Sequence, residues 1–147
     1  YLGHEIHRGA IGDLLYYDSI RVNLGGFQKT NVLWDLAPHD ISILDYLTRG
    51  KTPTQVSAVG VRHFSSKVET LCYANFIYDD HFVAHLHLNW AAPTKVRQIM
   101  IGGSKKMVIY DDNIPTEKIR TYDKGVDLNH LTESDFRVNY RIGDMVA

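Results

Sequence analysis

An aspartate and a histidine four residues apart, Asp35 and His39, are the two residues of this chain whose types and spacing best suit catalysis. Side chains at positions i and i+4 of an α-helix lie on one face, one turn apart. A carboxylate in that position can orient an imidazole and stabilise its protonated form, which a general base near neutral pH requires. The same spacing also fits a structural role, in which Asp35 caps the start of a helix beside a surface histidine.

The residues around this pair predict the helix that it needs. Apolar residues recur at helical spacing and form a stripe that can face a core, so we expect a helix from about Asp35 to Leu47. Pro38 fits the first turn of such a helix, where backbone N–H groups have no intrahelical partner. The apolar stripe consists of Leu36, Ile43, Leu44 and Leu47.

Alternating polar and apolar residues predict that most of the remaining chain forms β-strands. In the first strand, residues 13–24, the side chains of Arg21 and Asn23 share one face. Both lead into the loop before the helix, so they and Gln28 are candidate ligand-binding residues. A short helix ending at Gly9 and the longer helix, beside a broad and largely antiparallel sheet, predict an α+β domain. Further strands are expected at residues 55–63, 68–78, 81–90, 95–101, 105–110, 118–122 and 136–140.

The composition is that of one globular domain. The chain has 147 residues, of which 44% are hydrophobic and 22% charged, which is enough for a core. A net charge of −1 with interspersed signs argues against a nucleic-acid partner, and no apolar run is long enough to span a membrane. The single cysteine, Cys72, forms no internal disulfide and no secretory signal is recognisable, so we expect a cytoplasmic protein with Cys72 buried in a strand.

Three polar clusters resemble metal ligands, but each has a simpler interpretation. His81, His85 and His87 share one strand face, yet no carboxylate of matching position accompanies them, so a polar sheet face or a subunit interface is favoured. The doublets Asp79-Asp80 and Asp111-Asp112 follow strands, where aspartate is common in turns. We therefore predict no metal site.

The segment Gly102-Gly103-Ser104 is glycine-rich, as loops that bind phosphate often are. A phosphate loop needs a helix behind it, whereas the residues after Ser104 alternate like a strand. This segment therefore predicts the turn of a β-hairpin.

Several short segments, in order, resemble the C-terminal domain of the Gfo/Idh/MocA family of NAD(P)-dependent oxidoreductases. The Asp35-x-x-x-His39 pair is similar to the motif in the central helix of that domain. Many members carry a glycine triplet just ahead of the aspartate, whereas here Gly25-Gly26 lies further upstream. The other matching segments are Gly9-Ala10-Ile11-Gly12-Asp13-Leu14, Asn89-Trp90 through Lys95-Val96-Arg97, Ile101-Gly102-Gly103-Ser104, Tyr110-Asp111-Asp112 and Tyr122-Asp123-Lys124-Gly125.

The resemblance implies an oxidoreductase that acts on a sugar, cyclitol or nucleotide-sugar hydroxyl, with His39 as the base and Asp35 as its partner. Arg21, Asn23 and Gln28 would then hold substrate hydroxyl or phosphate groups. The sequence has no G-x-G-x-x-G fingerprint, so NAD or NADP would be bound mainly by a separate N-terminal domain that this chain lacks.

Residues 1–147 would accordingly form a single substrate-binding and oligomerisation domain, inactive alone. Its uncovered sheet face would form the interface of a homodimer or homotetramer. The alternative is a non-catalytic sugar-binding or structural homologue that keeps the sheet for assembly.

Overall fold

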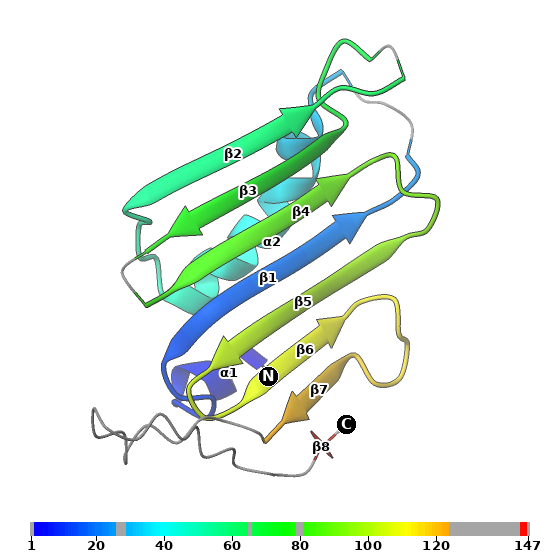
Figure 1. The fold of residues 1–147 in the computed structure, drawn as a ribbon. Coiled ribbons are helices and arrows are strands. Elements are labelled where there is room, and N and C mark those ends of the chain that lie inside the picture. Colours follow the sequence, from blue (N-terminus) through cyan, green and yellow to red (C-terminus); the bar gives the residue numbers. More distant parts are fainter. Residues whose placement is uncertain (1, 26–28, 65, 79–80, 124–144, 147) are drawn as a thin grey trace, which may run out of the picture.

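The chain folds into one broad sheet with a long helix packed across one face (Figure 1). The computed structural model describes residues 2–25, 29–64, 66–78, 81–123 and 145–146. Among these residues, neither helix has the length and apolar character needed to span a lipid bilayer. The elements are α1 (Leu2–His7), β1 (Leu14–Val22), α2 (Val32–Thr48), β2 (Gln55–Val61), β3 (Leu71–Ile77), β4 (Val83–Asn89), β5 (Val96–Gly103), β6 (Met107–Asp111), β7 (Ile119–Tyr122) and β8 (Met145–Val146).

The sheet is mixed, and its strand order is β2-β3-β4-β1-β5-β6-β7-β8. The central pair, β1 and β4, is parallel, and the other neighbouring strands are antiparallel. The predicted α+β class with a largely antiparallel sheet is therefore confirmed. The expected strand at residues 136–140 lies outside the described residues.

The hairpin of β5 and β6 is present as predicted, but its turn is shifted. Gly102 and Gly103 belong to β5, and the Gly103 N–H donates to the Lys106 carbonyl at 2.9 Å across the turn. A side chain at Gly103 would collide with the carbonyl of Ile11. The glycine is therefore required by a close backbone approach and not by the turn itself.

Helix α2 begins earlier than predicted. Asn31 is its N-cap, with Oδ1 accepting a hydrogen bond from the Trp34 N–H at 3.1 Å. Pro38 therefore lies inside the helix and not in its first turn, so that part of the prediction was wrong. The helix ends close to the expected residue, because Arg49 adopts the left-handed conformation, with φ at 56°, and closes it.

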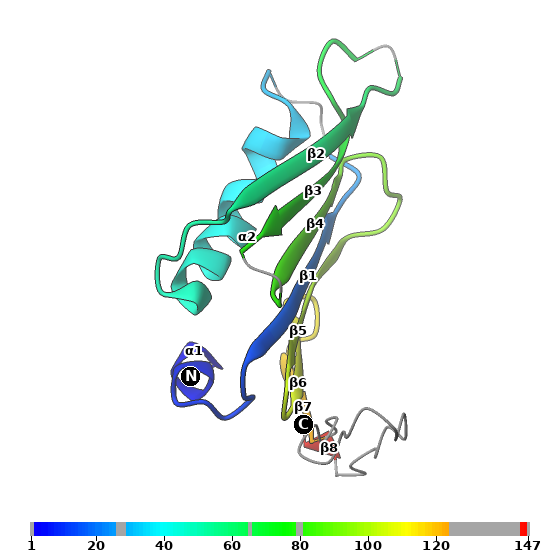
Figure 2. The ribbon, with the colours of Figure 1, turned by 60° about the vertical axis from the view of Figure 1, so that its left-hand side comes forward.

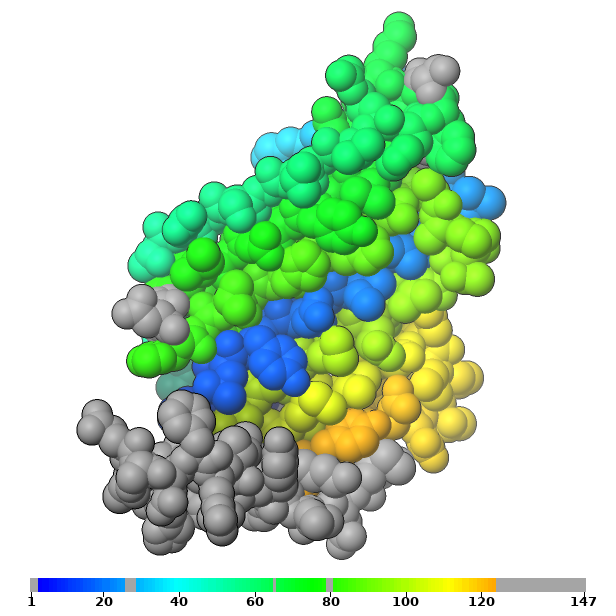
Figure 3. Space-filling view, viewed as in Figure 1, coloured from blue at the N-terminus to red at the C-terminus, as the bar shows by residue number. Residues whose placement is uncertain are grey.

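The core lies between α2 and the sheet face formed by β1, β3 and β4. The turned view shows both described helices on this side of the sheet (Figure 2). From the predicted stripe, Leu44 and Leu47 are buried, while Leu36 and Ile43 are half-buried. Cys72 is buried as expected. The opposite sheet face carries no described helix, and its strands form the surface seen in the space-filling view (Figure 3).

Candidate functional site

Asp35 lies in the first turn of α2, where the helix dipole favours a negative charge. Its Oδ2 accepts a hydrogen bond from Nε1 of Trp90 at 3.0 Å. Trp90 follows β4 and is only 3% exposed, so the carboxylate is anchored to a buried residue of the sheet. Because Asn31 is the N-cap, the alternative in which Asp35 caps the helix is wrong.

His39 lies one turn further along α2, and its side chain is exposed. Its carbonyl accepts a hydrogen bond from the Ser42 hydroxyl at 2.8 Å. Within the part of the chain that the structure describes, no side chain hydrogen-bonds the His39 ring, Asp35 included. The imidazole is therefore not buried in the core, and no described side chain occupies its nitrogens.

The direction in which His39 faces follows from helical geometry. Positions four apart lie on one flank of a helix, so His39 and Ile43 share a flank. Ile43 and Asp40 line a small pocket of about 80 Å³ together with residues of β5 and β6. Helix α2 packs on β1, β3 and β4. His39 therefore lies on the flank of α2 that faces β5 and β6, above sheet that α2 does not cover.

A buried ion pair joins this part of α2 to β1. The Asp40 carboxylate is fully buried and accepts two hydrogen bonds from Arg21, from Nε and from Nη2, each at 2.9 Å. The hydrogen bond to Asp40 raises the pKa of Arg21 above its ordinary value. Sequence reasoning missed Asp40, although its position was informative: it lies in the apolar stripe, four residues after Leu36 and four before Leu44.

The three candidate ligand-binding residues are not brought together. Arg21 directs two of its nitrogens to Asp40, although its side chain remains 15% exposed. Asn23 is exposed just beyond β1, where its backbone N–H donates to the Asn89 carbonyl at 2.9 Å. Gln28 lies outside the described residues. Their roles in binding substrate stay predictions.

Polar side chains of β5, β6 and the following turn surround Asp112 beside the small pocket. Asp112 Oδ1 accepts from the Tyr110 hydroxyl at 3.0 Å and from Lys118 Nζ at 3.1 Å. Its Oδ2 is 3.6 Å from Arg97 Nη1. These contacts, with Lys118 first, lower the pKa of Asp112. Asp111 Oδ1 accepts from the Asn113 N–H at 3.0 Å, in keeping with the turn role expected for this doublet.

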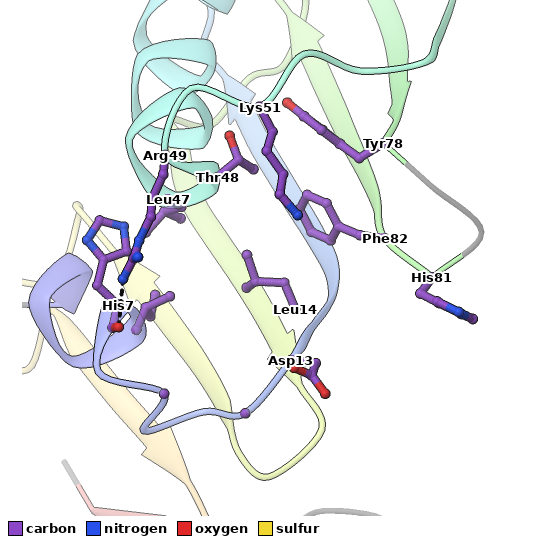
Figure 4. A pocket seen from close by; sticks show the side chains of 13 residues that line it. His7, Asp13, Leu14, Leu47, Thr48, Arg49, Lys51, Tyr78, His81 and Phe82 are labelled. Atoms are coloured by element: carbon purple, nitrogen blue, oxygen red, sulfur yellow. Dashed lines mark hydrogen bonds between the residues drawn. The ribbon is translucent and has the colours of Figure 1, made fainter.

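A larger cavity of about 440 Å³ lies at the other end of α2, between α1, the start of β1 and the residues around β4 (Figure 4). Within it, Arg49 Nη2 donates to the His7 carbonyl at 2.8 Å. Thr48, which lines it, is about 13 Å from His39 along the helix axis. Of the predicted catalytic and substrate-binding residues that the structure describes, Arg21, Asn23, Asp35 and His39, none lines this cavity.

The histidines of β4 lie on the uncovered sheet face, as predicted for a polar sheet surface. His85 Nδ1 is 2.8 Å from Asn75 Oδ1, and the Tyr73 ring lies 4.7 Å from His87 between centroids. Burial lowers the pKa of His87, and its Nε2 is buried without a hydrogen-bond partner. His81 precedes β4, and the doublet Asp79-Asp80 lies outside the described residues. The described residues contain no group of three or more His, Cys, Asp or Glu side chains suited to a metal ion.

The fold and the site together define an α+β domain in which a helix with a D-x-x-x-H motif covers part of a mixed sheet. The family model described as GFO/IDH/MocA C-terminal domain matches residues 4–109, so the chain belongs to the Gfo/Idh/MocA family. No curated protein matches the chain by sequence.

Solved structures of similar fold include three named dehydrogenases. UDP-N-acetylglucosamine 3-dehydrogenase GnnA from Acidithiobacillus ferrooxidans has a TM-score of 0.70 at 19% identity, covering 98% of this chain and 44% of that one. Levoglucosan dehydrogenase, in complex with NADH and levoglucosan, has a TM-score of 0.72 at 17% identity, covering 98% and 42%.

The WlbA dehydrogenase from Bordetella pertussis, in complex with NADH and UDP-GlcNAcA, has a TM-score of 0.66 at 15% identity, covering 80% of this chain and 40% of that one. At these identities the likeness concerns the fold. The chain spans less than half the length of each of these three proteins.

Proposed function

We propose that this chain is the substrate-binding and oligomerisation domain of an NAD(P)-dependent oxidoreductase that acts on a sugar, cyclitol or nucleotide-sugar hydroxyl. The observation that carries the proposal is the exposed His39 imidazole, which has no side-chain partner among the described residues and lies one turn from a fixed carboxylate. The family match and the sugar-type compounds named for the neighbouring structures support this substrate class.

In this proposal, His39 accepts the proton of the substrate hydroxyl while the carbon that bears it loses a hydride. Asp35 lies one turn away and favours the imidazolium that results, and Trp90 keeps the carboxylate in place. The nicotinamide of NAD or NADP supplies the hydride acceptor when the cofactor is bound.

In this proposal, the pyrophosphate of the cofactor is bound mainly outside this chain. The N-terminus of α2 could offer N–H groups to an anion, but two of them are already used. The Val32 N–H donates to the Glu69 carbonyl at 3.0 Å, and the Trp34 N–H donates to Asn31 at 3.1 Å. This occupancy supports a separate N-terminal domain as the main binding site of the cofactor.

Assembly through the uncovered sheet face is the second part of the proposal. Large apolar side chains are exposed on this face, and two buried nitrogens of the described residues, His87 Nε2 and Arg120 Nε, have no hydrogen-bond partner there. Monomers seldom leave such surfaces exposed, and a twofold interface is a common way to cover them. A homodimer or homotetramer would bury Tyr16, Val59, Val61, Tyr73 and Val83.

The catalytic part is tested in the full-length oxidoreductase that contains this domain. His39→Ala should lower kcat by roughly 10²–10⁴-fold, the contribution of a positioned acid or base, with dinucleotide affinity nearly unchanged. His4→Ala is the control, because His4 is 69% exposed and lies on α1. Normal turnover of the His39 variant would remove His39 from the mechanism and favour a non-catalytic sugar-binding or structural homologue.

A further inference from the structure

Two arginines lie side by side on the sheet below His39. Arg21 of β1 and Arg97 of β5 are direct partners in the antiparallel register, so their side chains emerge on the same face. Like charges that are directly opposite each other on neighbouring strands destabilise a sheet unless anions compensate them. The positive charges of the two arginines are neutralised to different extents by nearby carboxylates.

Arg21 is paired with a buried carboxylate, because Asp40 accepts hydrogen bonds from two of its nitrogens at 2.9 Å. Arg97 has one ion pair among the described residues, a 3.6 Å approach to Asp112. That carboxylate has closer partners in Lys118 at 3.1 Å and the Tyr110 hydroxyl at 3.0 Å. The side chain of Arg97 is also 38% exposed, so most of its donors remain available.

The ion pairs around these two arginines leave a net positive charge. Arg21 and Asp40 cancel each other, which leaves Arg97 and Lys118 facing the single carboxylate of Asp112. All but Lys118 line the pocket of about 80 Å³ between α2 and the sheet. This space is small beside the cavity of about 440 Å³ at the other end of α2, so it suits a compact group such as a carboxylate or a phosphate.

We propose that Arg97 binds an anionic group of the substrate, a carboxylate or a phosphate, on the sheet beside His39. The guanidinium fork matches both oxyanions with two parallel hydrogen bonds. Arg21, held in place by Asp40, and Tyr110 also line this subsite. The identification of the anion as part of a substrate rests on the proposed function, whereas the binding site itself does not.

The test is titration of the ¹⁵N-labelled chain with glucuronate, UDP and neutral glucose, followed by the amide resonances of residues 97–113 in NMR spectra. Glucuronate, UDP or both should bind more tightly than glucose. Arg97→Gln should raise the Kd of the anion about tenfold or more, as expected for loss of a charge-assisted pair. A response confined to UDP identifies a phosphate subsite, and one confined to glucuronate identifies a carboxylate subsite.

Two further variants keep the test specific. Lys95→Gln removes an equal charge from an exposed residue that does not line the pocket, and it should leave the Kd unchanged. Asp112→Asn removes the competing carboxylate from Arg97 and should tighten anion binding, which a purely structural role would not do. Equal losses in the Arg97 and Lys95 variants, weaker binding by Asp112→Asn, or equal binding of glucose and the anions would overturn the proposal.

This result is separable from the catalytic proposal, because binding is measured without turnover. Arg97-dependent anion binding combined with normal kcat of His39→Ala would retain the subsite and reject His39 as the base. Loss of kcat in His39→Ala without any anion binding would retain His39 as the base and reject the anion subsite.

Discussion

The carboxylate of Asp35 has a neutral partner in Trp90 and not a direct bond to His39. Asp35→Asn keeps an oxygen that can accept from the Trp90 indole but loses the negative charge. We therefore expect a lower kcat in the full-length enzyme with little change in Tm. Trp90→Phe, which removes the donor and keeps the charge, is the matched comparison. A normal kcat with a lowered Tm for Asp35→Asn would assign Asp35 a structural role only.

His87 predicts a pH dependence of stability. Burial, and to a smaller extent the neighbouring His85, lowers the pKa of His87 in the folded state, while Asp18 opposes the shift. As the pH falls through the ordinary histidine pKa of about 6.5, the unfolded chain takes up a proton before the folded chain does. The contribution of His87 is thus complete above that pH and declines below it, until the lowered pKa is reached.

His87→Gln should accordingly reduce the fall in Tm between about pH 7 and pH 5. His4→Gln serves as the comparison because His4 is 69% exposed. An unchanged pH profile in the His87 variant would show that this imidazole does not control acid stability.

At the scale of elements, the Arg21 and Asp40 pair fastens α2 to β1. Asp40→Ala leaves a largely buried guanidinium without its partner and should cost about 3 kcal/mol of unfolding free energy. The double variant Arg21→Met, Asp40→Leu should cost markedly less, because it replaces both charges with apolar groups. Denaturant unfolding of the two variants measures the difference. Equal losses would indicate that the stabilisation comes from packing and not from pairing of the charges.

The sequence predicted elements better than it predicted their ends and their pairing. The alternation in β2, β3 and β4 and the stripe of Leu44 and Leu47 are local patterns, and the structure confirms them. The start of α2 was misjudged because Asn31 and Asp35 can both cap a helix and Pro38 favours a first turn.

Contacts between residues far apart in the sequence could not be predicted from local sequence patterns. The parallel pairing of β1 with β4 depends on contacts between distant residues, as does the bond from Trp90 to Asp35. Asp40 was overlooked because its partner, Arg21, belongs to another element and was judged only as a ligand-binding residue. Asp35 and His39 could be singled out from the sequence because their i,i+4 spacing is itself local, and their catalytic role stays a prediction.

At the scale of the whole molecule, the uncovered sheet face predicts self-association. Val59 and Val56 lie on opposite faces of β2 and are 58% and 56% exposed, so they form a matched pair. Sedimentation at micromolar concentration should show a dimer or larger species. Val59→Glu should shift this species towards the monomer, whereas Val56→Glu on the helix side should not. A clean monomer of the unmodified chain would contradict assembly through this face.

The position of β1 in the sheet also constrains how the chain folds. β1 precedes every other strand in the sequence, yet it lies at the centre of the sheet, and its partners begin only at Val83 and Val96. Loop closure over such separations slows folding, and both edges of β1 stay unpaired until the later strands have been synthesised. A nascent chain that emerges from the ribosome with β1, α2 and β2 alone therefore exposes both unpaired edges of β1, which favours aggregation.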